Sequence, residues 1–250
     1  NFVVTAATNV GSCPGVSSTY TITVNPSPIV ASTGSVVVCN GGQVSAQNFT
    51  GTGTSYTWAN DLPNIGLAAS GTNSIAAFTA INNTSSVQTP NITVTPQYLG
   101  SGIQCSGSAT NFTIAVNPTP TVLATNDLAF CNGAVTAPLS FSGSGTSYNW
   151  TNSNTSIGLS ASGPNALPSY TATNATSVPV TATVNVTPIF TGGGVTCTGT
   201  QDQFLITVNP TPTVTDPLDQ VRCNQAQTAA INFTGSATSY NWTNNNQSIG

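Results

Sequence analysis

Six cysteines carry most of the reactive chemistry in this sequence, and they are regularly spaced. They are Cys13, Cys39, Cys105, Cys131, Cys197 and Cys223, and the gaps between them alternate between 26 and 66 residues. No histidine is present and no two cysteines are close enough in sequence for an all-cysteine zinc site. The pattern therefore predicts disulfides, and with them an oxidising, extracellular setting.

The composition excludes most catalytic chemistry. The chain has one Lys or Arg in total (Arg222), five Asp and Glu in total, and no His, Lys or Glu. Without these residues it has no imidazole base, no Schiff-base lysine and no paired glutamates. We expect no catalytic, cofactor or metal site, and the single Arg222 excludes a basic patch for nucleic acid. No apolar run approaches the roughly 18 residues of a spanning helix, so no membrane contact is expected within these residues.

A repeat of 92 residues organises the chain. The cysteines form two series with this period, and the tryptophans Trp58, Trp150 and Trp242 are each 92 residues apart. The pairs Asn25-Pro26, Asn117-Pro118 and Asn209-Pro210 follow the same period. A tandem array is the direct interpretation. Because neither end of the chain falls at a repeat boundary, we expect it to be a segment of a longer array.

The boundaries of the repeats are best placed at the recurring Val-Asn-Pro-x-Pro motif. Two prolines one residue apart favour an extended, semi-rigid linker. This placement predicts four parts. Residues 1–25 are the C-terminal part of one module, 26–117 and 118–209 are complete modules, and 210–250 are the N-terminal part of another.

Alternating apolar and polar residues predict strands within each module. They occur at 20–24, 112–116 and 204–208, at 55–58 and 147–150, and at 91–94 and 183–186. Pro96 and Pro188 follow the last pair of segments and predict a strand end or a sheet edge. About seven or eight short strands per 92 residues are typical of an all-β, antiparallel sandwich of Ig-like size.

Two disulfide schemes are compatible with the spacing. Pairing within modules gives Cys39–Cys105 and Cys131–Cys197, and leaves Cys13 and Cys223 with partners outside these residues. Pairing across the linkers gives Cys13–Cys39, Cys105–Cys131 and Cys197–Cys223. We favour the first scheme, because a bridge inside a module supports it as a folding unit.

The remaining repeated residues have structural interpretations. One tryptophan per module, between two cysteines in sequence, predicts core positions for Trp58, Trp150 and Trp242. Asn-x-Ser/Thr triplets, for example at Asn48, Asn91, Asn111, Asn174 and Asn232, match the glycosylation signal, but Asn, Ser and Thr are so frequent that chance explains them.

The module resembles the PKD-like and Ig-like tandem repeats of giant cell-surface proteins of the Bacteroidota. The resemblance rests on Cys-Asn-Gly at 39–41 and 131–133, Thr-Ser-Tyr-x-Trp at 54–58, 146–150 and 238–242, Ile-Gly-Leu-x-Ala-Ser-Gly at 65–71 and 157–163, and the Val-Asn-Pro-x-Pro endings. The third copy departs from it with Gln225 in place of glycine. The resemblance implies PKD-like β-sandwiches in a type IX secretion cargo, of which the SprB-type gliding-motility adhesins are the best-known kind.

These observations predict the stalk of a long extracellular adhesin filament at the cell surface, serving attachment or gliding motility. Its partners would be the adjacent modules, with extracellular polysaccharide or a substratum as further partners. Two alternatives stay open: modules that themselves bind glycans or surfaces through rows of Thr and Asn, and accessory modules of a secreted polysaccharide-degrading enzyme.

Overall fold

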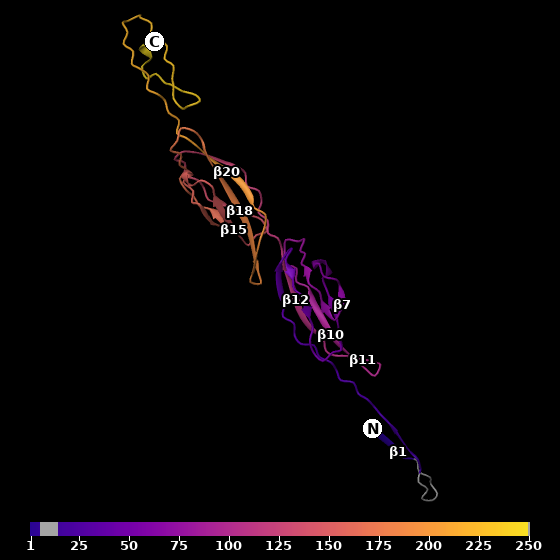
Figure 1. Ribbon diagram of the computed structural model, residues 1–250. Helices are drawn as coiled ribbons and strands as arrows, with labels where there is room; N and C mark the ends of the chain where they lie inside the picture. The colour runs from indigo at the N-terminus through magenta and orange to yellow at the C-terminus, as the bar shows by residue number, and fades with distance from the viewer. Residues whose placement is uncertain (6–14, 250) are drawn as a thin grey trace. The chain divides into compact units, whose positions relative to one another are not determined.

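The computed structural model describes residues 1–5 and 15–249, which form two compact units (Figure 1). Unit 1 comprises residues 1–119 together with the segment 191–196, and unit 2 comprises 120–190 and 197–250. Regular structure is nearly all β, with a few short 3-10 turns. No helix in the described part of the chain is long and apolar enough to cross a membrane. Cys13 lies outside the described residues.

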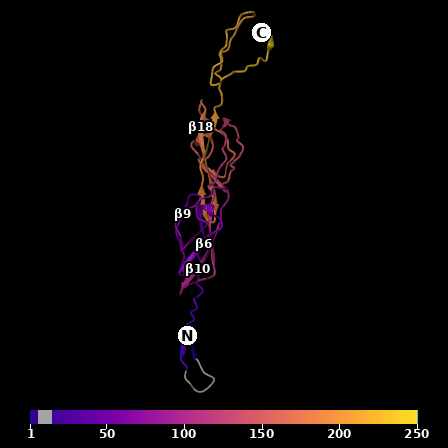
Figure 2. The same cartoon turned by 90° about the vertical axis from the view of Figure 1, so that its right-hand side faces the viewer.

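The main sheet of unit 1 has the strand order β3-β12-β10-β6-β7, with β11 paired to β10. The pairs β4–β9 and β5–β8 form small separate sheets, and β1 pairs with β2. Figure 2 labels β6, β9 and β10 of this unit in a second view. The elements of this unit are β1 (Phe2–Thr5), β2 (Ser17–Tyr20), β3 (Val36–Cys39), β4 (Gln43–Val44), β5 (Gln47–Asn48), β6 (Ser55–Asn60), the 3-10 turn η1 (Pro63–Ile65), β7 (Ser70–Thr72), β8 (Ser74–Ile75), β9 (Phe78–Thr79), β10 (Asn91–Gly100), β11 (Ile103–Ser106) and β12 (Thr110–Asn117).

The main sheet of unit 2 repeats this order as β13-β20-β18-β15-β16, with β19 paired to β18 and a separate β14–β17 pair. Its elements are β13 (Leu128–Cys131), β14 (Leu139–Ser140), β15 (Ser147–Asn152), η2 (Thr155–Ile157), β16 (Ser162–Pro164), β17 (Ala166–Leu167), β18 (Val180–Gly192), β19 (Val195–Thr198) and β20 (Asp202–Asn209). One 3-10 turn, η3 (Gln247–Ile249), follows near the end of the described residues.

Each core lies on one face of the main sheet because the strands alternate in polarity. In β10, Ile92 and Val94 are fully buried, whereas Thr93 and Thr95 lie on the other face. The predicted strands at 112–116 and 204–208 lie within β12 and β20, and every second residue from Phe112 and from Phe204 is buried, whereas Leu205 is exposed. Both sheets are antiparallel except for one parallel pair each, β3 with β12 and β13 with β20.

The prediction that Pro96 and Pro188 mark a strand end or a sheet edge is wrong, because both lie inside long strands that have a neighbour on each side. β10 pairs with β12 only up to Val94 and with β11 only from Gln97 onward. Pro96 sits at this change of partner, where no donor is needed, and its carbonyl oxygen accepts a hydrogen bond from the Gly107 backbone N–H at 3.0 Å. A residue without an N–H therefore fits the middle of the strand at this one place.

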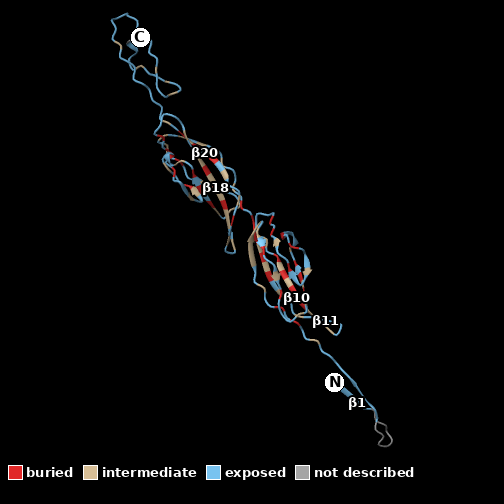
Figure 3. Cartoon of the chain, viewed as in Figure 1, coloured by how far each residue is buried: buried red, intermediate tan, exposed pale blue. Residues whose placement is uncertain are grey.

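The tryptophan prediction holds for the two complete sandwiches. Trp58 and Trp150 are buried, and their indole N–H groups donate to the carbonyls of Ser74 at 3.2 Å and Ala166 at 2.9 Å. Trp242 is instead 72% exposed. Trp58 pairs across the sheet with β10, and the described residues after Trp242 contain no counterpart of that strand. Figure 3 shows the result: buried residues follow β10, β18 and β20, and the segment after β20 is mostly exposed.

Candidate functional site

The side chain of Asn117, the last residue of β12, holds the tip of a glycine-rich hairpin. Its Nδ2 donates to the carbonyl oxygens of Gly192 at 2.9 Å and Val195 at 3.3 Å, both within the 191–196 segment of unit 1. Asn117 is 1% exposed. Gly193 has φ 57°, and a Cβ there would lie 2.9 Å from the Val37 side chain. The tip therefore requires a residue without a side chain. We call Val37, Cys39 and Asn117 the hairpin socket.

An asparagine 92 residues earlier makes the same contact. Nδ2 of Asn25 donates to the carbonyl oxygens of Gly100 at 2.8 Å and Ile103 at 3.2 Å, at the turn between β10 and β11. In both places the two acceptors follow the asparagine by 75 and 78 residues. In these two copies of the Val-Asn-Pro motif the asparagine therefore binds a hairpin tip in addition to preceding the prolines.

Cys39 ends β3 directly opposite Asn117 in the parallel strand pair. Its Sγ lies 3.7 Å from the carbonyl oxygen of Thr196. Cys39 is disulfide-bonded to Cys197, the residue that follows this hairpin segment, and Cys197 is 4% exposed. A covalent bond therefore accompanies the two hydrogen bonds of Asn117 at the hairpin socket.

The predicted pairs Cys39–Cys105 and Cys131–Cys197 are wrong, and so is the alternative pairing across the linkers. Cys105, Cys131 and Cys223 are free thiols in the described part of the chain. Which partners Cys13 and Cys223 have outside these residues stays a prediction.

Sheet register explains why the cysteines of one sandwich do not meet. Cys39 lies four strand positions beyond the Asn91–Thr113 pair toward one end of the sheet, and Cys105 lies seven positions beyond it toward the other. At about 3.3 Å per position these eleven positions separate the two residues by roughly 36 Å. A disulfide needs Cα atoms within about 7 Å. Cys131, opposite Asn209, and Cys197, next to the turn after β18, occupy the matching places in unit 2.

The Cys-Asn-Gly motif forms the turn that places Cys39. The Asn40 backbone N–H donates to the Asn117 carbonyl oxygen at 2.9 Å, and its side-chain Nδ2 donates to Thr119 Oγ1 at 2.9 Å. Gly41 has φ 78°, in the region that favours glycine. Gln225 takes this position in the third copy with φ 67°.

Asn-x-Thr triplets occur in a buried turn. Asn174 is 4% exposed, and its Nδ2 donates to the carbonyl oxygens of Val178 at 2.8 Å and Val208 at 2.7 Å. Its Oδ1 accepts from the backbone and hydroxyl of Thr176. Asn82 makes the matching bonds in unit 1. Both amide hydrogens are used, so these two triplets are structural and not glycosylation signals.

Asp61 and Asp127 each accept a hydrogen bond from one backbone N–H group. Oδ1 of Asp61 accepts from the Asn91 N–H at 2.8 Å, and Ser153 Oγ accepts the equivalent bond in unit 2 at 2.8 Å. Likewise Oδ1 of Asp127 accepts from Leu205 at 2.8 Å, a role that Ser35 has in unit 1. A neutral serine replaces the carboxylate, so these positions need an acceptor and not a charge. No group of three His, Cys, Asp or Glu able to hold a metal ion occurs among the described residues.

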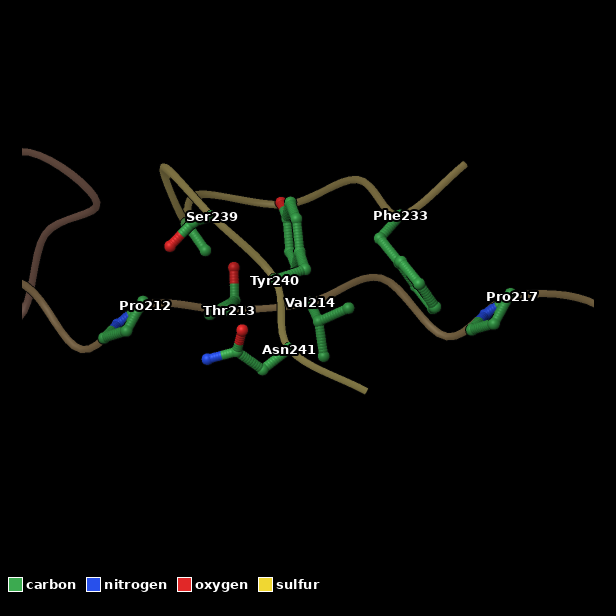
Figure 4. Close-up of a pocket in the computed structure, with 9 residues that line it drawn as sticks. Pro212, Thr213, Val214, Pro217, Phe233, Ser239, Tyr240 and Asn241 are labelled. Carbon is green, nitrogen blue, oxygen red and sulfur yellow. The ribbon is translucent and has the colours of Figure 1, made fainter. Parts of the chain in front are cut away.

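A pocket of about 360 Å³ lies in the third copy, where Phe233 and Tyr240 face it together with Val214 (Figure 4). The two rings are 6.0 Å apart. The equivalent pairs, Phe49–Tyr56 and Phe141–Tyr148, are each completed by a third ring, Phe112 or Phe204. The pocket is therefore core space that an aromatic strand fills in the complete sandwiches, and not a small-molecule site.

Residues 36–120 match the model of the PKD-like domain family. This range contains all strands of the main sheet of unit 1, so the likeness to a PKD-like β-domain covers that whole sandwich. No curated protein is significantly similar in sequence.

Solved structures with some likeness are cadherin ectodomains. Extracellular cadherin domains 1–4 of protocadherin gamma B7 align at 10% identity and a TM-score of 0.33, over 78% of this chain and 55% of that chain. Human mucin-like protocadherin EC1-2 aligns at 11% identity and a TM-score of 0.35, over 74% and 98%. The chain thus spans about half the length of the first of these proteins. Both TM-scores are below 0.5, and we draw no functional conclusion from them.

Sequence reasoning missed the hairpin socket. The signal was present, because Asn25, Asn117 and Asn209 recur with the period. The two prolines that follow each asparagine already explained the motif as a linker. The sequence around a single amide side chain does not indicate which distant carbonyl oxygens it will bind.

Proposed function

We propose that the chain is part of the repeat stalk of an extracellular adhesin at the cell surface. PKD-like domains are extracellular-type modules that commonly serve adhesion or form stalks. The disulfide between Cys39 and Cys197 supports an oxidising compartment. The finer assignment to a type IX secretion cargo of the gliding-motility adhesin kind rests on the sequence resemblance.

One observation supports the stalk role above the others: the hairpin socket makes polar contacts to a segment that belongs to another repeat. Asn117 and Cys39 belong to one 92-residue copy, and the hairpin they hold belongs in sequence to the next. Asp61, Asp127 and the buried Asn82 and Asn174, by contrast, bond to groups of their own sandwich. A protein that transmits load needs this distribution, whereas an enzyme or a ligand-binding module needs convergent polar groups in a cleft.

Surface binding by the modules themselves is the second candidate, and the outer sheet face favours it. Thr95 lies opposite Thr57 on neighbouring strands of unit 1, and the Thr181 and Thr207 hydroxyls are 3.2 Å apart in unit 2. Repetition of such hydroxyl rows would give avidity to weak contacts. Retention on polysaccharide columns that increases with repeat number would support this candidate.

The stalk proposal is tested by small-angle scattering on chains of two and four complete repeats. We expect the maximum dimension to grow by about 35–45 Å per repeat, since strands of 6–8 residues, end loops and the proline segment add up to this length. Four-repeat particles no longer than two-repeat particles would refute the stalk.

A further inference from the structure

Unit 2 contains a second copy of the hairpin socket. Asn209 ends β20 and lies opposite Cys131, the last residue of β13. The Asn132 backbone N–H donates to the Asn209 carbonyl oxygen at 2.8 Å, and Asn132 Nδ2 donates to Thr211 Oγ1 at 3.0 Å. These bonds match those of Asn40 in unit 1, so the backbone that presents the socket has the same form.

The difference between the two sockets is their occupancy. Asn117 is buried under the 191–196 hairpin, whereas Asn209 is exposed and its amide makes no hydrogen bond to a described residue. Cys131 is an exposed free thiol, whereas its counterpart Cys39 is disulfide-bonded. Ala129 takes the place of Val37 and is exposed as well. The polar groups that bind a hairpin are thus present in unit 2 and point to solvent.

We propose that Asn209 and Cys131 form a receiving site for the glycine-rich, cysteine-bearing hairpin of a further repeat. The amide of Asn209 donates to two carbonyl oxygens of the hairpin tip, and Cys131 forms a disulfide with the hairpin cysteine. Two occupied copies within this chain, at Asn117 and Asn25, define the occupant as a tip of the type found at 192–197 and 100–105.

The covalent step is an ordinary thiol oxidation. The Cys131 thiol and the hairpin thiol form one S–S bond and release two protons and two electrons. In the experiment below glutathione disulfide accepts them and is reduced to two molecules of glutathione. The proposal predicts a series of disulfides in which the first cysteine of each repeat is bonded to the hairpin cysteine of the next repeat. A tensile force on the array would then act on these disulfides as well as on the proline segments. It rests on the repeat and not on the adhesive function.

The test lengthens the full chain after Gly250 by a second copy of residues 159–250, which continues the repeat in phase. The protein is refolded in a mixture of oxidised and reduced glutathione and is mapped as non-reduced peptides by mass spectrometry. We expect a peptide that joins Cys131 to the added copy of Cys197, and loss of Cys131 alkylation by a thiol reagent relative to the unextended chain. The Cys39–Cys197 peptide serves as internal proof of folding and oxidation.

Asn209→Ala should reduce the yield of the Cys131 link and restore alkylation of Cys131. Gln203→Ala, an exposed change on the same strand, should leave both unchanged. The proposal is refuted if Cys131 stays alkylatable or bonds to another cysteine in protein whose Cys39–Cys197 bond has formed, and equally if the Cys39–Cys197 bond itself does not form. Small-angle scattering tests the stalk proposal without reference to the disulfides. A failure of the receiving-site proposal can therefore be distinguished from a failure of the stalk proposal.

Discussion

Tyr170 and Phe78 occupy the same position of the two units and differ by one hydroxyl group. The Tyr170 hydroxyl is buried without a hydrogen-bond partner in the described structure, and burial raises the pKa of Tyr170 above its usual value of 10.0. An unsatisfied buried hydroxyl costs free energy that Phe78 does not incur. The two repeats thus contain a natural comparison of the same site with and without this group.

Tyr170→Phe should stabilise unit 2 by about 1 kcal/mol at neutral pH, because it removes the unsatisfied hydroxyl. The raised pKa means that the unfolded chain loses the phenolic proton at lower pH than the folded chain. The free energy of unfolding of the natural chain is therefore independent of this group below about pH 10 and falls as the pH rises further. Denaturant unfolding at neutral pH and above about pH 10 should show a smaller alkaline loss of stability in the variant.

Phe78→Tyr in unit 1 is the matched control, and it should lower stability and add alkaline sensitivity. Destabilisation by Tyr170→Phe at neutral pH would show that the hydroxyl is in fact satisfied.

Asn-x-Thr turns show how one polar residue fastens an element to the sheet. Asn174 bonds the turn to the Val208 carbonyl oxygen of β20 and closes the turn through the Val178 carbonyl. Its backbone N–H donates to Asn132 Oδ1, so the same asparagine also positions the Cys-Asn-Gly turn. This connected set of asparagines holds the edge strand β13 against the sheet end, and it has the same form around Asn82.

Asn174→Ala should destabilise unit 2 by roughly 3 kcal/mol, because it leaves buried carbonyl and N–H groups without partners. Asn232→Ala, at an exposed triplet of the same Asn-x-Thr form, should change stability by less than about 0.5 kcal/mol. Thermal unfolding of the two variants under one set of conditions makes the comparison. Equal effects would contradict a structural role for the buried turn.

At the scale of the whole molecule, one disulfide connects residues 158 positions apart in sequence. A closed loop of this length restricts the unfolded chain strongly, and the chain-entropy model gives a contribution of about 5 kcal/mol. This matters in a chain with one cationic side chain, where surface ion pairs contribute little.

Reduction of the native chain should lower the free energy of unfolding by roughly 2–5 kcal/mol. Non-reduced peptide mapping should find Cys39 joined to Cys197, with thiols at Cys105 and Cys131. Cys105→Ser should leave the unfolding midpoint unchanged, whereas Cys39→Ser should reproduce the effect of reduction. A peptide that joins Cys39 to Cys105 would overturn the structural assignment.

The strands and the core were predictable from sequence because they depend on local alternation. Ile92 and Val94 must face one side of β10 wherever that strand lies, and Trp58 and Trp150 recur where a sandwich needs a large apolar residue. Pro96 was assigned wrongly for the same reason. Its place inside β10 is allowed only by the change of partner from β12 to β11, which is a property of two other strands.

The sequence by itself determined the repeat, the β-class and the oxidised state that regularly spaced cysteines imply. Only the tertiary structure decided which cysteines meet, because pairing depends on the sheet ends at which they lie. Register separates Cys39 and Cys105 by the length of the sheet, and it places Cys39 next to Asn117, whose amide receives a hairpin from 75 residues further along the chain. The 92-residue period shows that the cysteine and asparagine positions recur. Which of these residues touch depends on the packing of strands that are distant in sequence.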